Sequence, residues 1–98
     1  MILNESKNQY QLFDEQTQIG IADFHLENQE MVLDHTVVEP KYGGQGLGEK
    51  LIFFALDDLL AKNYQVVPQC SFVAKIIKKY PEKYLDLVSV ENRKLFGI

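Results

Sequence analysis

The densest group of chemically unusual residues is a glycine-rich stretch in the middle of the chain. Four of the six glycines, Gly43, Gly44, Gly46 and Gly48, fall close together there. Because glycine has no Cβ, such a loop can turn its backbone N–H groups to one side and let a ligand approach closely. An apolar helix is expected to follow, and the first N–H groups of a helix lack internal partners and carry partial positive charge. The stretch therefore predicts a phosphate-binding loop; the alternative is an ordinary flexible turn.

One cysteine and one histidine could supply reactive groups. Cys70 comes at the end of a predicted strand and the start of a predicted helix, where the helix dipole favours the thiolate and Lys75 acts in the same direction. His35 lies on the neighbouring predicted strand, so the two side chains could meet. Such a pair allows covalent catalysis through Cys70 or general-base catalysis by His35. The alternatives are a small buried cysteine and a structural core histidine.

The length, composition and net charge of the chain limit the classes of protein that need to be considered. Ninety-eight residues predict a single domain over 1–98, and 46% hydrophobic residues are typical of a folded chain. A net charge of −4 argues against nucleic-acid binding. The longest apolar region, 51–60, is interrupted by Asp57 and Asp58 and is too short for a membrane span. With no secretory signal and no metal-ligand spacing, we expect a cytoplasmic protein without a metal, as a monomer or weak dimer.

The first half of the chain is expected to form an antiparallel meander. Alternating apolar residues and short polar turns predict strands over 2–3, 9–14, 19–26 and 31–38. Strict alternation in the last of these strands places His35 and Val37 on the same face as Met31 and Leu33.

The second half changes to helical periodicity. The pattern predicts a helix over 46–61, a strand over 65–70, a second helix from about Ser71 and a short extra helix over 82–90. Asn63 is expected to end the first helix in a left-handed conformation. Pro68 cannot donate to a β-ladder, so pairing should stop just before Cys70. The long helix between two strands implies a parallel, right-handed βαβ unit.

Two common phosphate-binding loops fail to match. A P-loop needs Lys-Ser or Lys-Thr after its glycines, and neither pair occurs here. A dinucleotide-binding Rossmann fold needs Gly-x-Gly-x-x-Gly in its first βα turn, whereas here the strands of the meander come first.

The order of elements and the loop resemble the GNAT superfamily of N-acetyltransferases. In that superfamily Arg/Gln-x-x-Gly-x-Gly/Ala leads into a helix, as Gly43-Gly44-Gln45-Gly46-Leu47-Gly48 does here. Asp34-His35-Thr36, Pro68-Gln69-Cys70 and Tyr80-Pro81-Glu82 are similar to motifs of the minimal single-domain branch. The resemblance covers about residues 8–88. It implies an α/β GNAT-type fold, with a meander followed by the βαβ unit.

The resemblance also implies a cofactor and site residues. It implies that acetyl-CoA binds with its pyrophosphate on the backbone of Gly43, Gly44, Gln45, Gly46, Leu47 and Gly48. Its pantetheine arm would pair with the main chain of Val37 and Val38 like an added strand. In the minimal branch, His35 and Cys70 occupy the positions suspected of catalysis.

Two positions depart from the superfamily pattern. Gly43 stands where Arg or Gln is usual, so one side-chain contact to phosphate is lost. The tyrosine that protonates the leaving thiolate in many GNATs falls near Lys78, and Tyr80 is the nearest substitute. We therefore expect an acetyl-CoA-dependent N-acetyltransferase acting on an unidentified amine. The alternative is a coenzyme-A-binding module with little or no catalysis.

Overall fold

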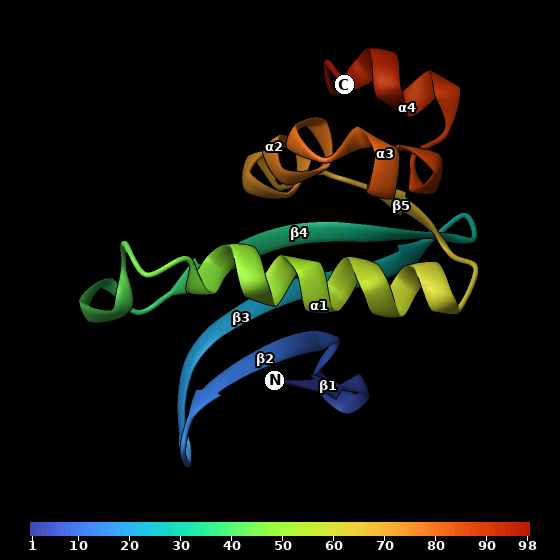
Figure 1. The fold of residues 1–98 in the computed structure, drawn as a ribbon. Coiled ribbons are helices and arrows are strands. Elements are labelled where there is room, and N and C mark those ends of the chain that lie inside the picture. The colour runs from blue at the N-terminus through green and yellow to red at the C-terminus, as the bar shows by residue number, and fades with distance from the viewer.

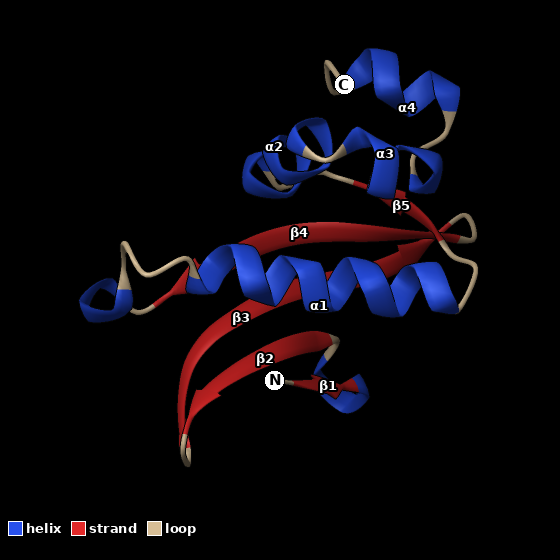
Figure 2. Ribbon diagram, in the orientation of Figure 1, coloured by secondary structure: helices blue, strands red, loops and turns tan.

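A computed structural model describes all 98 residues and contains one five-stranded sheet (Figures 1 and 2). The strands, ordered as in the sequence, are β1 Ile2–Asn4, β2 Gln9–Asp14, β3 Thr17–Glu27, β4 Glu30–Val38 and β5 Gln65–Val67. β1 to β4 form an antiparallel meander, and β5 pairs with β4 in parallel. The predicted fold class, a meander followed by a βαβ unit, is confirmed.

Four helices accompany the sheet. They are α1 Leu47–Ala61, α2 Ser71–Lys79, α3 Pro81–Tyr84 and α4 Val90–Leu95. α1 lies across one face of the sheet, while α2, α3 and α4 lie beyond its β5 edge in the view of Figure 1. Asn63 follows α1 with a φ of 62°, the left-handed stop that was predicted. No helix combines the length and apolar character needed to cross a bilayer.

The chain after α2 differs from the prediction. A helix over 82–90 was expected, but α3 ends at Tyr84 and a 3-10 turn, Leu85–Leu87, separates it from α4. The side chain of Ser89 then caps α4 by accepting a hydrogen bond from the N–H of Asn92.

The hydrophobic core lies between α1 and the sheet. Helical spacing places Leu51, Ile52, Ala55, Leu56 and Leu59 on one buried side of α1. α2 adds Val73, Ile76 and Ile77 to the same cluster. Removing these apolar surfaces from water is the main force that fixes α1 and α2 against the strands.

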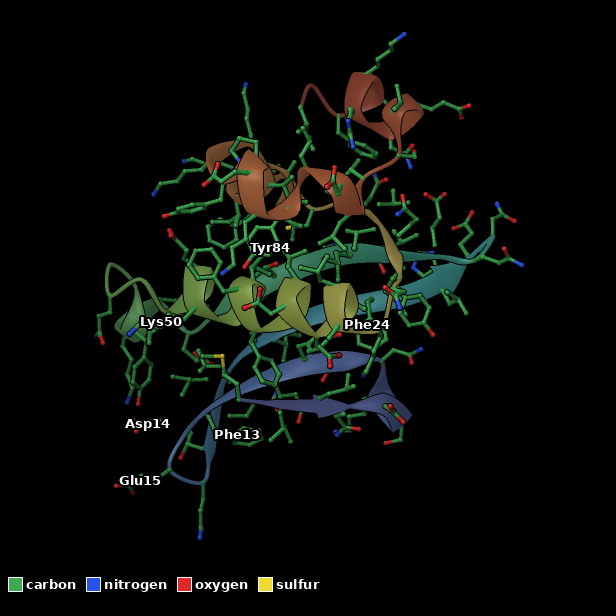
Figure 3. All side chains as sticks on the ribbon, turned by 45° about the vertical axis from the view of Figure 1, so that its right-hand side comes forward. Phe13, Asp14, Glu15, Phe24, Lys50 and Tyr84 are labelled. Atoms are coloured by element: carbon green, nitrogen blue, oxygen red, sulfur yellow. The ribbon has the colours of Figure 1, made fainter.

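Two acidic residues of α1 accept hydrogen bonds from buried tyrosines. Tyr84 reaches from α3 toward α1 (Figure 3), and its hydroxyl donates to Asp57 at 2.8 Å. The hydroxyl of Tyr10 on β2 donates to Asp58 at 2.7 Å. Asp57 is exposed at the surface of α1 and still serves as an acceptor, because the Tyr84 side chain reaches it from α3.

A β-bulge in β4 changes which side chains face the core. Asp23 pairs with His35 while the next residue, Phe24, pairs with Leu33, so Asp34 is an extra residue with no partner in β3. The bulge reverses the alternation: Thr36, opposite buried Ala22, lies on the α1 face, whereas His35 lies on the other face. The prediction that His35 and Val37 share a face with Met31 and Leu33 is therefore wrong.

Candidate functional site

The glycine loop presents unused hydrogen-bond donors at the start of α1. Gly44 and Gly46 have φ values of 77° and 74°, in the left-handed region where a Cβ introduces strain. Gly46 is the N-cap of α1 and supplies no side-chain cap. The N–H groups of residues 44–49 donate no hydrogen bond within the protein. These donors and the helix dipole make the loop suited to an anion such as a phosphate.

A cavity of about 330 Å³ opens beside this loop. Thr36 and Val38 of β4 line one side, Phe72 of α2 lines another, and the loop itself completes the wall. Gly48 lies close to two of these residues, since a Cβ at this position would lie 3.4 Å from the Phe72 ring and 3.6 Å from Val38. The cavity thus joins an apolar wall to a set of free N–H donors.

β4 and β5 separate next to this cavity. They pair only where Glu30–Val32 meets Gln65–Val67. Beyond that, the N–H of Cys70 donates to the carbonyl of Leu33 at 2.8 Å, and no further backbone bond joins the two segments. The edge of β4 from Asp34 to Val38 is consequently open. The strand predicted over 65–70 is shorter than expected, because the regular ladder ends at Val67 and only the single bond from Cys70 follows it.

A second cavity, of about 440 Å³, occupies the gap between β4 and the segment that follows β5. Its lining residues are Asp34, His35, Thr36, Val37, Gln69, Cys70 and Ser71. Thr36 also lines the cavity beside the glycine loop, so the two cavities are neighbours.

Cys70 and His35 both line the gap, but the structure does not join them. Cys70 is the N-cap of α2, and its thiol donates to Thr36 Oγ1 at 3.5 Å. His35 is exposed and makes no side-chain hydrogen bond or ion pair, so the alternative of a core histidine is wrong. Thr36 is the partner that sequence reasoning missed, although it stood in the Asp-His-Thr motif.

Tyr80 is engaged away from the gap. Its hydroxyl donates to Glu49 Oε1 at 2.9 Å, and Lys79 Nζ lies 3.7 Å from the other oxygen of that carboxylate. Tyr80 lines neither cavity. It is therefore not placed to replace the tyrosine that the sequence lacks at Lys78.

A histidine that the sequence did not single out lies on the face opposite α1. His25 Nδ1 lies 2.7 Å from Asp34 Oδ2, and its Nε2 lies 2.9 Å from Glu27 Oε2. These hydrogen bonds, first to Glu27 and then to Asp34, raise the pKa of His25 above its ordinary value of 6.5. Asp34 thus connects the gap to a polar cluster on the β3–β4 hairpin.

Comparison with known proteins gives one family match. The sequence model of the GCN5-related N-acetyl-transferase family matches residues 9–87. No curated protein sequence gives a significant match.

Two solved structures are similar to this fold. A GCN5-like putative N-acetyltransferase from Staphylococcus aureus, solved by NMR, is 28% identical with a TM-score of 0.62, over 84% of this chain and 81% of that one. The ribosomal-protein-S18-alanine N-acetyltransferase from Escherichia coli is 24% identical with a TM-score of 0.55, over 61% of this chain and 41% of that one. The second likeness concerns the fold alone, and the chain spans less than half of that enzyme's length.

The family match covers the elements that build both cavities, from β2 through the glycine loop to the turn after α3. It agrees with the resemblance in the sequence and with the order of the strands and helices. This protein therefore belongs to the GCN5-related N-acetyltransferase family.

Proposed function

We propose that this protein is an acetyl-CoA-dependent N-acetyltransferase that acts on an amine. One observation carries the proposal: the cavity with free N–H donors at the start of α1 adjoins, through Thr36, the gap beside the open edge of β4. This arrangement suits a long ligand with an anionic diphosphate at one end and a reactive group at the other.

The residues present fit coenzyme A. The backbone N–H groups of the Gly43–Gly48 loop would bind the pyrophosphate, together with the dipole of α1. Val37 and Val38 would offer main-chain groups to the amide-containing pantetheine arm, because this part of β4 has no partner on the β5 side. Side chains of Val38, Leu47 and Phe72 supply apolar contact along the way.

Acetyl-CoA supplies an activated acyl group as a thioester. In the reaction the amine nitrogen bonds to the acetyl carbon, the carbon–sulfur bond breaks, the nitrogen loses one proton and the released sulfur gains one. We assign His35 as the base that accepts the proton from nitrogen, since it is exposed at the gap.

We assign Cys70 the complementary role of donating its thiol proton to the leaving sulfur, with Thr36 Oγ1 holding the thiol in position. Both groups then return to their starting protonation states by exchange with water. The covalent alternative, in which Cys70 carries the acetyl group, needs a base to activate the thiol. The contact of Cys70 is a hydroxyl oxygen, which favours direct transfer.

Calorimetric titration with coenzyme A and a screen of amines for thiol release from acetyl-CoA test the proposal. We expect heat of binding and amine-dependent thiol release. Absence of binding would refute it. Binding without turnover across primary alkyl, aryl and peptide amines would instead favour a coenzyme-A-binding module. Mass spectrometry of the protein after incubation with acetyl-CoA checks the route, because direct transfer predicts no acetyl adduct on Cys70.

A further inference from the structure

A cavity of about 520 Å³ lies at the opposite end of α1 from the glycine loop. Its walls are mainly apolar and aromatic, and they include Tyr10, Phe24, Leu26, Met31 and Leu59. Phe24 lies near the C-terminal end of α1 in Figure 3. The cavity shares no lining residue with the gap or with the cavity beside the glycine loop. The acetyl-transfer chemistry proposed above therefore makes no use of it.

The edge of β3 beside this cavity has no strand partner. The β3–β4 hairpin extends beyond the start of β2 (Figure 1). The N–H of Phe24 donates to the carbonyl of Asn8, but the N–H of Asn8 donates to the carbonyl of Glu5 and not back to β3. Asn8 has a φ of 54°, so the chain turns away from β3 at this residue. Residues 25–27 of β3 consequently have no neighbour on the β2 side.

Leu26 offers main-chain and side-chain contacts at this open edge. Residues of an antiparallel strand direct their N–H and C=O groups to alternate sides. The N–H of Phe24 points toward β2, so both groups of Leu26, two residues further on, point the same way and have no backbone partner there. The Leu26 side chain lies opposite Met31, is 57% exposed and lines the cavity. This edge residue carries neither the charge nor the proline that commonly blocks the addition of a strand.

The charge that is left unpaired at the rim of the cavity is negative. Lys62 Nζ lies 2.9 Å from Asp58 Oδ2, and His25 already contacts two carboxylates. Glu5, the one acidic residue of the lining, makes no ion pair. The rim therefore favours a cationic group beside the apolar part of a ligand.

We propose that this edge and cavity bind an extended peptide segment of another protein. The segment has an apolar residue, with Lys or Arg two residues away on the same face. It continues the ladder where β2 leaves it, antiparallel to β3, and exchanges hydrogen bonds with the N–H and C=O of Leu26. The open main chain is what favours a peptide over a small apolar molecule, which would use the cavity alone.

The placement of the side chains follows from the pleat. The peptide residue opposite Leu26 points to the same face of the sheet as Leu26, so it enters the cavity against Phe24 and Leu59. Residues two positions away return to this face, where a Lys or Arg comes near Glu5. The main-chain bonds supply affinity for any extended segment, whereas the cavity and Glu5 select the sequence.

NMR titration of the isotope-labelled protein with synthetic peptides tests the proposal. The parent probe is acetyl-Thr-Lys-Thr-Leu-Thr-Lys-Thr-amide. We expect it to shift the backbone amides of residues 5–10, 24–27 and 59–64, which surround the cavity. Alanine in place of the peptide leucine should weaken binding roughly tenfold or more, because the buried side chain is lost. Equal affinity of these two peptides, or shifts confined to other surfaces, would overturn the proposal.

Leu26→Pro and Leu26→Ala separate the main-chain contribution from the side-chain contribution. Both lose the leucine side chain, but only the proline variant also loses the open N–H, which points away from β4 and leaves the β3–β4 ladder intact. The proline variant should bind the parent peptide roughly fivefold more weakly than the alanine variant, the effect of one hydrogen bond. Equal affinities would contradict strand addition.

A modified peptide repeats this comparison on the unaltered protein, so the test does not depend on the folding of the proline variant. N-methylation of the peptide leucine removes the N–H that would donate to the Leu26 carbonyl. The methylated peptide should bind roughly fivefold more weakly or worse. Binding as tight as that of the parent peptide would overturn the proposal.

Glu5→Gln tests the choice of a basic segment, with Glu15→Gln as the matched control. Glu15 lies at the tip of the β2–β3 hairpin, far from Phe24 (Figure 3). Glu5→Gln should weaken the parent peptide roughly fivefold, as expected for a nearby charge in water, and Glu15→Gln should not. A peptide with serine in place of both lysines should bind the unaltered protein and the Glu5 variant equally. An unchanged affinity of the parent peptide for the Glu5 variant would contradict the basic sequence.

Other occupants of the site give different results. Sedimentation that shows a dimer, with broadening of residues 24–27 in the absence of peptide, would assign the edge to a second copy of this chain and overturn the proposal. Hexanol binding as tightly as the parent peptide would assign the cavity to small apolar molecules and overturn it as well. Saturating coenzyme A should leave the affinity of the peptide unchanged, since the two sites share no residue. Competition between them would contradict this placement.

Discussion

Thr36 Oγ1 and Cys70 Sγ lie 3.5 Å apart across the gap between β4 and the start of α2. Thr36 reaches this position because the bulge at Asp34 turns it to the α1 face. Cys70 is held there by its own N–H, which donates to the carbonyl of Leu33. Two separate backbone features therefore bring the hydroxyl and the thiol together.

Thr36→Val should lower kcat for acetyl transfer by roughly three- to tenfold, because it removes one hydrogen bond of about 1 kcal/mol that positions the Cys70 thiol. Thr36→Ser keeps the oxygen and should restore most of the rate. Steady-state kinetics with the best amine from the screen provide the measurement. Equal rates for the valine and serine variants would contradict the positioning role.

Gly46→Ala should weaken coenzyme A binding at least roughly tenfold, since a Cβ at a φ of 74° strains the loop that presents the N–H donors. Gly97→Ala is the matched control. Gly97 has a φ of 69°, and a Cβ would meet nothing within 4 Å at either position. Calorimetry should find normal binding by the Gly97 variant. Comparable losses in both variants would indicate a general effect of backbone strain.

His35→Gln should reduce kcat by roughly 100-fold or more while leaving the KM for acetyl-CoA nearly unchanged, because general-base catalysis typically contributes that much. His35 is exposed, so free imidazole should be able to reach the gap and partly restore the rate. The measurement is the rate of thiol release as a function of imidazole concentration. Full activity of the variant without imidazole would remove His35 as the base.

Tyr84→Phe should lower the free energy of unfolding by about 1.5–3 kcal/mol, the usual value of a hydrogen bond to a charged group. Burial, followed by the bond to Asp57, raises the pKa of Tyr84, so its hydroxyl remains a donor. Tyr64→Phe is the control, because the Tyr64 hydroxyl makes no hydrogen bond. Urea denaturation measures both, and equal losses would show that the bond to Asp57 contributes nothing.

Much of the fold was predictable because its signals are local. Polar turns between alternating strands indicate a meander, and the glycine loop before a helical pattern marks the start of α1 within one residue. The left-handed Asn63 and the end of pairing after Val67 also follow from single residues with known backbone preferences. Because these signals are local, the order of strand, glycine loop and helix around residues 31–61 could be predicted from the sequence.

The bulge at Asp34 could not be predicted, since it depends on how β4 pairs with β3 and leaves no periodic trace. It decides that Thr36 and not His35 meets Cys70, and that Asp34 reaches His25 on the opposite face. The start of α4 was missed for a different reason. Its cap, Ser89, follows a 3-10 turn that the short apolar pattern did not separate from a helix.

The His25 cluster should make stability depend on pH. Its hydrogen bonds to Glu27 and Asp34 raise the pKa of His25 in the folded protein above 6.5, so folding favours the protonated ring. The stabilising contribution is fully present below 6.5, the value expected when unfolded, and is lost as the pH rises through the higher folded-state pKa. His25→Gln should therefore reduce stability at about pH 5 more than at about pH 9.

Urea denaturation of the unaltered protein and the His25→Gln variant across this pH range measures the difference. Glu27→Gln removes the largest cause of the shift and should give an intermediate pH dependence. NMR titration of the His25 ring should give a higher pKa in the unaltered protein than in the Glu27→Gln variant. The stability difference between the unaltered protein and His25→Gln could instead stay constant with pH. That result would mean that the two carboxylates do not favour the charged form of the His25 ring.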